Sequence, residues 1–60
     1  MPASIRMFYI GAAQQKYSDT KTRLFDDYDY DRISKAEYER KLEEARQEML
    51  ETIKWAKEAD

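Results

Sequence analysis

The sequence predicts a mainly α-helical fold in one small domain spanning residues 1–60. Charged residues make up 40% of the chain, which contains one Gly and one Pro, and this composition is typical of helix-rich proteins rather than all-β or disordered ones. A chain of 60 residues buries only about 60% of its unfolded surface, so we expect a small core. The alternative fold is α+β, with an N-terminal β-hairpin packed on a long helix.

The clearest predicted element is one long C-terminal helix over residues 34–58. Ser34 and Glu37 have the spacing of a capping box, in which each side chain accepts a hydrogen bond from the backbone of the other. No Gly or Pro follows, and strong helix formers dominate to the end. At 100° per residue, one apolar stripe collects Tyr38, Leu42, Ala45, Met49, Ile53 and Ala56.

The N-terminal segment fits two structures. Residues 4–10 are rich in strand formers and are followed by Gly11, which favours a short strand. The same segment also fits a helix, because four apolar residues have i, i+3, i+4, i+7 spacing, namely Ile5, Phe8, Tyr9 and Ala12. Periodicity alone leaves both structures open.

A short second helix is expected next, with Ser18 or Asp19 as its cap and Leu24, Phe25 and Tyr28 on one face. The apolar residues of the front half then only just suffice to cover the long helix; they are Ile5, Phe8, Ile10, Leu24, Phe25 and Ile33. Leftover apolar surface would favour a homodimer.

The chain contains no His and no Cys. Imidazole bases, thiol nucleophiles, the usual zinc sites and disulfides are therefore excluded, and we expect neither an enzyme nor a cofactor. No run approaches 18 apolar residues, and the first residues do not begin a signal peptide. We therefore expect a cytoplasmic protein without a membrane segment.

Charge is unevenly distributed along the chain. Residues 1–25 hold four bases and one acid, a balance of +3, whereas residues 26–60 hold seven bases and twelve acids, a balance of −5. Four of these acids lie within six residues and are candidate partner-binding groups: Asp26, Asp27, Asp29 and Asp31. In an extended chain, alternate carboxylates would lie roughly 7 Å apart, a spacing comparable to that of nucleic-acid phosphates.

A second candidate surface is an acidic ridge on the long helix, formed by Glu37, Glu44, Glu48, Glu51 and Trp55. The helical wheel places it roughly opposite the apolar stripe. Tryptophan is enriched at binding hot spots, so Trp55 is either a partner-binding residue or part of the core. The plainer interpretation of the glutamates is a solvated helix face.

The alternating aspartates also resemble the start of an EF-hand calcium loop. Arg32 occupies the position where that loop requires Gly, and Glu37 is one residue out of step with the bidentate ligand. A degenerate cation site is therefore a third and weaker hypothesis.

Residues 24–42 resemble the short C-terminal helical-hairpin domain called SHOCT, through Leu24-Phe25 and the helix start from Ile33-Ser34 to Glu37-Tyr38. The resemblance implies a helical hairpin. The chain lacks the Gly usual in that turn and continues much further.

In general character, being short, free of cysteine and acidic on one side, the chain is similar to phage-encoded anti-CRISPR proteins, several of which mimic DNA. The resemblance implies an inhibitor in the host cytoplasm that occupies a basic, nucleic-acid-binding surface, such as that of a CRISPR effector. Direct nucleic-acid binding is disfavoured by the modest basic segment. The alternative is a helical adaptor or oligomerisation module that pairs through Leu42, Met49 and Ile53.

Overall fold

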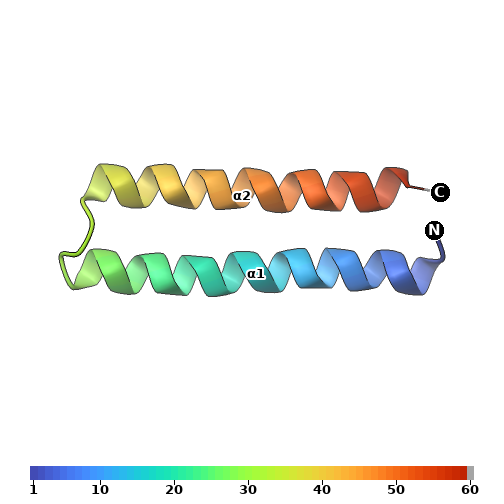
Figure 1. The fold of residues 1–60 in the computed structure, drawn as a ribbon, viewed down its shortest axis with the longest axis horizontal. Helices are drawn as coiled ribbons and strands as arrows, with labels where there is room; N and C mark the ends of the chain where they lie inside the picture. Colours follow the sequence, from blue (N-terminus) through green and yellow to red (C-terminus); the bar gives the residue numbers. More distant parts are fainter. Residues whose placement is uncertain (60) are drawn as a thin grey trace.

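The computed structural model describes residues 1–59, which form an antiparallel helical hairpin. Helix α1 (Ala3–Asp29) and helix α2 (Lys35–Glu58) lie side by side and are joined by a short turn, so both chain ends lie at the end opposite the turn (Figure 1). The mainly α fold class is confirmed. No strand occurs in residues 1–59, so the α+β alternative is not supported.

Of the two structures predicted for residues 4–10, the helix is confirmed and the strand is not, but this helix is not a short separate element, because residues 3–29 form one continuous helix. Gly11 does not end a strand; it lies inside α1, where a helical Gly costs only about 1 kcal/mol relative to Ala. Ser18 and Asp19 do not cap a second helix either. The Asp19 carboxylate accepts a hydrogen bond from Gln15 Nε2 at 2.9 Å, one turn earlier, so this residue is satisfied within the helix.

A Schellman motif ends α1. The Asp31 N–H donates to the Tyr28 carbonyl at 3.1 Å, and the Arg32 N–H donates to the Asp27 carbonyl at 2.8 Å. Asp31 has a φ of 57°, the left-handed conformation that usually selects Gly at this position. The predicted extended run over 27–31 is therefore wrong, because the helix continues through Asp29.

Helix α2 starts one residue later than the predicted range of 34–58, because Ser34 is its N-cap. The Glu37 N–H donates to Ser34 Oγ at 3.1 Å, which is one half of the expected capping box. The Glu37 carboxylate does not complete it and instead pairs with Lys41 Nζ at 3.1 Å. A glutamate in the first turn still interacts favourably with the helix dipole.

The two helices pack through stripes that repeat every three and four residues. In α2, all six members of the predicted apolar stripe are buried or half-buried, which confirms it. In α1, the residues that are not fully exposed are Arg6, Ile10, Ala13, Tyr17, Thr20, Leu24, Asp27 and Tyr28. This alternating spacing of three and four is that of a coiled-coil seam.

The core between the helices is thin. Among the hydrophobic residues of the described part of the chain, only Leu24, at 6% exposure, and Ala56, at 0%, are buried. Three residues expected to cover the long helix, Ile5, Phe8 and Phe25, are exposed. Small or polar α1 residues lie along the seam instead, so the hairpin buries less apolar area than its composition allows.

Three contacts fix the antiparallel register. Near the turn, the Tyr28 and Tyr38 rings stack with centroids 5.1 Å apart. At the other end, the Tyr9 and Trp55 rings meet edge to face at 5.1 Å. The Arg6 guanidinium donates from Nη2 to the Ala59 carbonyl at 3.2 Å, placing a cation at the C-terminal end of α2, where the helix dipole favours one.

Candidate interaction surfaces

One broad side of the hairpin carries most of the predicted site on α2 together with an unexpected set of α1 residues. We call this side the aromatic face. Its α1 members are Ile5, Phe8, Tyr9, Ala12, Lys16 and Arg23; its α2 members are Lys41, Glu44, Glu48, Glu51 and Trp55. They share this side by helical period, and two contacts between the helices, Tyr9–Trp55 and Lys16–Glu48, place the two sets together.

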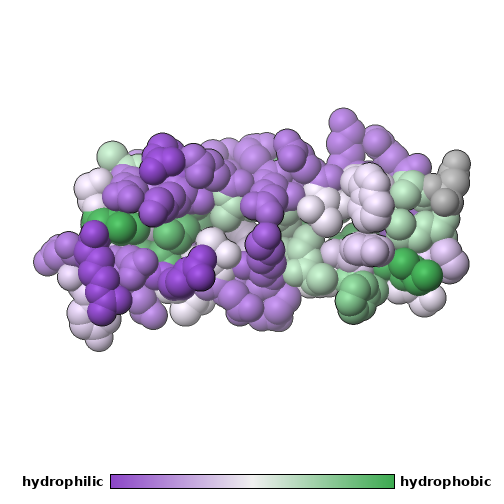
Figure 2. Space-filling view, in the orientation of Figure 1, coloured by the Kyte–Doolittle hydropathy of each residue, from purple (hydrophilic) through white to green (hydrophobic). Residues whose placement is uncertain are grey.

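The end of the aromatic face nearest the chain termini is apolar. Phe8 and Tyr9 meet edge to face with ring centroids 5.8 Å apart, and Tyr9 meets Trp55 in the same way. Phe8 is 69% exposed and Trp55 is 49% exposed. Figure 2 shows hydrophobic atoms at this end, a second hydrophobic group between the helices near the turn, and hydrophilic atoms over most of the rest. Trp55 thus combines both expectations: it packs against α1 while half of its surface remains open.

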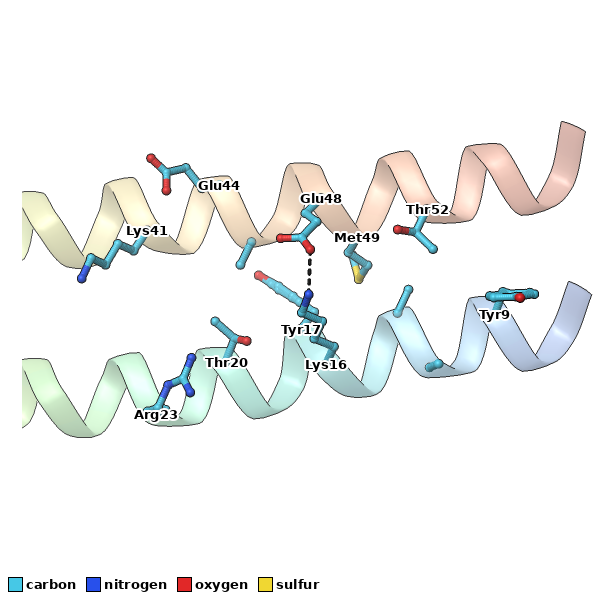
Figure 3. Close-up of a pocket in the computed structure, with 13 residues that line it drawn as sticks. Tyr9, Lys16, Tyr17, Thr20, Arg23, Lys41, Glu44, Glu48, Met49 and Thr52 are labelled. Carbon is cyan, nitrogen blue, oxygen red and sulfur yellow. Dashed lines mark hydrogen bonds and ion pairs between the residues drawn. The ribbon is translucent and has the colours of Figure 1, made fainter. Parts of the chain in front are cut away.

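A groove of about 440 Å³ runs along the middle of this face, between the helices. Tyr17 and Met49 lie in the space between the helices, and the Lys16–Glu48 ion pair spans it at 2.7 Å (Figure 3). The groove forms because several lining residues are small, namely Ala12, Ala13, Thr20, Ala45 and Thr52. It is an open surface feature with apolar walls and charged margins.

The acidic ridge lies at the edge of the groove and not opposite the core stripe as predicted. Glu48 reaches across to Lys16 of α1, which shows that its side of α2 borders α1. Three ridge glutamates have basic partners: Glu37 pairs with Lys41 at 3.1 Å, Glu44 with Arg40 at 2.8 Å, and Glu48 with Lys16. Of the four ridge glutamates, only Glu51 forms no ion pair within residues 1–59, so much of the expected negative field of the ridge is neutralised locally.

The turn end keeps more of its negative charge. Asp27 accepts from Arg32 Nη1 at 3.3 Å, and the same guanidinium lies 5.5 Å from the centre of the Tyr30 ring. Asp26, Asp29 and Asp31 are in no ion pair within residues 1–59. Residues 26–37 hold five acids and two bases, a balance of −3 confined to one tip of a long, narrow molecule.

The turn does not bring the aspartates together as cation ligands. Asp27 and Asp29 are two positions apart on a helix, so their side chains point to opposite sides of α1. Residues 1–59 contain no group of three or more acidic side chains that could hold a metal ion. The EF-hand hypothesis therefore has no geometric support.

The outer side of α2 holds a separate carboxylate with a perturbed pKa. Gln47 Nε2 donates to Glu43 Oε1 at 2.8 Å, and Arg46 donates from Nε to Oε2 at 3.2 Å. These bonds, that from Gln47 first, hold the pKa of Glu43 below its usual value because they favour the ionised form. This local cluster lies away from the aromatic face.

Sequence reasoning found Trp55 and the aspartates but missed Phe8, Tyr9 and Lys16 as surface residues. A signal for the first two was present, since Phe8 and Tyr9 belong to the i, i+3, i+4, i+7 pattern of residues 5–12. That pattern describes a real stripe of α1, but a different stripe faces α2. Lys16 has no signal in its local sequence, because its partner lies 32 residues away.

Comparisons with protein-family models, with curated proteins and with solved structures found no match for this chain. Neither of the two helices described has a stretch that is both long and apolar enough to cross a membrane. Function must therefore be argued from the surfaces described above.

Proposed function

We propose that this protein is a small non-enzymatic inhibitor whose acidic turn end binds a basic, nucleic-acid-binding surface of a partner protein and occupies it. The observation that carries this proposal is the surplus of aspartates without ion pairs at the tip of the hairpin. A rigid end with a balance of −3 is attracted to a cationic groove over a range set by the Debye length, about 8 Å at physiological salt.

The ion pairs limit which acidic residues would contribute to this contact. The glutamates of the ridge share their charge with Lys16, Arg40 and Lys41, so they add little net field. Asp26, Asp29 and Asp31 form no ion pair within residues 1–59, so their charge is available to a partner. We therefore assign recognition chiefly to the turn end, with Glu51 and the ion-paired acids in a supporting role. A CRISPR effector is one partner of the required chemistry.

The proposal is tested by competition. A basic nucleic-acid-binding complex, such as a CRISPR effector loaded with its guide, is incubated with labelled target DNA and increasing amounts of this protein. We expect inhibition that weakens as salt rises, because contacts between charged surfaces are screened. Inhibition that does not change with salt, or no inhibition by the unmodified chain, would contradict the proposal.

Two matched triple variants separate the turn end from net charge. Asp26→Asn, Asp29→Asn and Asp31→Asn together should weaken inhibition by about 10-fold or more, which corresponds to about 1.4 kcal/mol. The control replaces Glu39, Glu43 and Glu58 by Gln, which changes the net charge equally but leaves the turn intact. Equal losses in both variants would mean that total charge, and not the turn end, determines binding.

A second candidate function is a helical adaptor or oligomerisation module, which the exposed aromatic cluster favours. The stripe first expected to mediate pairing, through Leu42, Met49 and Ile53, faces α1 within the hairpin. The aromatic face is an apolar surface that remains available for another helix pair, and it holds the exposed Ile5, Phe8 and Trp55. A dimer by sedimentation, with a melting temperature that rises with protein concentration, would support this function.

A further inference from the structure

We infer that the aromatic face binds a second copy of this chain, forming a four-helix bundle whose two-fold axis runs parallel to the long axis of the hairpin. This inference rests on the second candidate function, the oligomerisation module, and not on the inhibitor function, because the acidic turn ends lie outside the paired faces at one end of such a bundle. It rests on the periodicity of α1, on the exposed area and on the charges of the aromatic face.

Helix α1 carries two apolar stripes but has one helical neighbour in the hairpin. The seam through Ile10, Tyr17 and Leu24 packs against α2. A second stripe, formed by residues 5, 8, 9 and 12, has the spacing of a buried helix face, yet Ile5, Phe8 and Tyr9 are exposed. A helix with two such stripes is typical of a bundle in which each helix contacts two others.

The single hairpin exposes a large surface for its mass. Its accessible area is 4688 Å². A folded monomer of 7.2 kDa exposes about 4,100 Å² on average, so the excess is roughly 600 Å². A stable interface of standard size buries about 800 Å² on each partner. The excess, counted over both broad sides, is of the same order as the area that one subunit buries in such an interface.

The net charges of the two helices on this side favour one symmetry axis. On this broad side, α1 contributes two bases, Lys16 and Arg23, and one acid, Asp19. Helix α2 contributes one base, Lys41, and four acids, namely Glu37, Glu44, Glu48 and Glu51. An axis parallel to the helices lays α1 of each copy over α2 of the other. The net positive side of α1 then lies over the net negative side of α2, with Lys16 level with Glu48. The same register brings Arg23 level with Lys41 and both acidic turn ends to one end of the bundle, and these like charges oppose the pairing.

The same axis also matches the levels of the side chains along the bundle. Within one hairpin, Tyr9 lies level with Trp55, and Lys16 lies level with Glu48. Rotation about the long axis preserves these levels, so Trp55 of one copy meets Phe8 and Tyr9 of the other, and Lys16 meets Glu48. An axis across the hairpin would instead place the aromatic end of each copy against the acidic turn end of the other.

The first test compares two exposed residues that are adjacent in sequence. Phe8 is 69% exposed and lies on the aromatic face, while Met7 is 66% exposed and points toward the opposite broad side. We expect the unmodified chain to sediment as a dimer at high micromolar concentration. Phe8→Glu should raise the dissociation constant about 100-fold, as at a hot spot, whereas Met7→Glu should leave it unchanged.

The second test uses charge to distinguish the symmetry. Lys16→Glu and Glu48→Lys should each weaken the homodimer, because each places like charges opposite one another across the axis. Mixing the two variants should restore association, since each copy then offers the charge that the other lacks. Circular dichroism at low concentration should show helical chains in every case, so that loss of the dimer is not loss of the fold.

Either of two results would contradict the inferred dimer. A monomer at high micromolar concentration for the unmodified chain would overturn it, as would a dimer that is lost with Met7→Glu but retained with Phe8→Glu. A dimer that depends on Phe8 but is not restored by mixing the two charge variants would overturn the proposed axis. The competition assay against a basic complex is read separately, because Phe8 does not belong to the turn end.

Discussion

At the scale of single residues, Asp31 holds a conformation that its side chain disfavours. It takes the left-handed position of the Schellman motif, with a φ of 57°, and a residue with a Cβ pays roughly 1 kcal/mol or more there. Aspartate tolerates this conformation better than most residues because its short side chain can bond locally. The turn is therefore built correctly but with some residual strain.

We expect Asp31→Gly to stabilise the hairpin by about 0.5–1 kcal/mol, because the gain from relieved strain exceeds the greater chain entropy of an unfolded Gly. The measurement is urea unfolding followed by circular dichroism at a fixed protein concentration. Asp31→Asn is the control, since it removes the same charge but keeps the side chain. If both variants change stability equally, charge rather than backbone conformation explains the effect.

At the scale of the helix, Gly11 has a low helix propensity but does not interrupt α1. A Cβ built at this position meets no atom within 4 Å, and the residue lies in the middle of regular α1. Gly11→Ala should therefore stabilise the protein by about 0.5–1 kcal/mol through helix propensity and reduced unfolded-state entropy. Thermal unfolding would measure this gain, and an unchanged or lowered midpoint would contradict it.

One half of the fold could be predicted from local sequence, and the other half could not. Helix α2 has a capping serine and one uninterrupted stripe, so its local sequence defines both its start and its buried side. Helix α1 has no side-chain cap at its start, and strand formers in its first residues. Only the partner helix reveals that residues 3–29 continue as one element, because packing overrides these weak local preferences.

The candidate site could likewise be predicted only in part. The acidic residues of 26–31 are evident in the sequence, but their arrangement depends on where α1 ends. That end is hard to predict because Asp31 occupies the position where Gly is expected. Trp55 stood out as an apolar residue beside glutamates. Its contact with Tyr9, 46 residues away, could not be deduced without the antiparallel register.

At the scale of the whole molecule, the hairpin measures 44 × 15 × 7 Å, a single layer of two helices. Both broad sides of such a layer remain open, so most side chains touch solvent on at least one edge. The thin core makes each seam contact a large part of the total stability, which is only 5–15 kcal/mol even in ordinary domains. Association through the aromatic face would add a second layer and a shared core.

The stacked pair Tyr28–Tyr38 also sets an order of folding. These residues are 10 apart in sequence, whereas Tyr9 and Trp55 are 46 apart, and closing the longer loop costs about 1.4 kcal/mol more chain entropy. The helices should therefore begin to pair at the turn and zip toward the chain ends. In stopped-flow kinetics of the monomer, Tyr28→Ala should mainly slow folding, whereas Trp55→Ala should mainly accelerate unfolding. The reverse pattern would place the folding nucleus at the aromatic end.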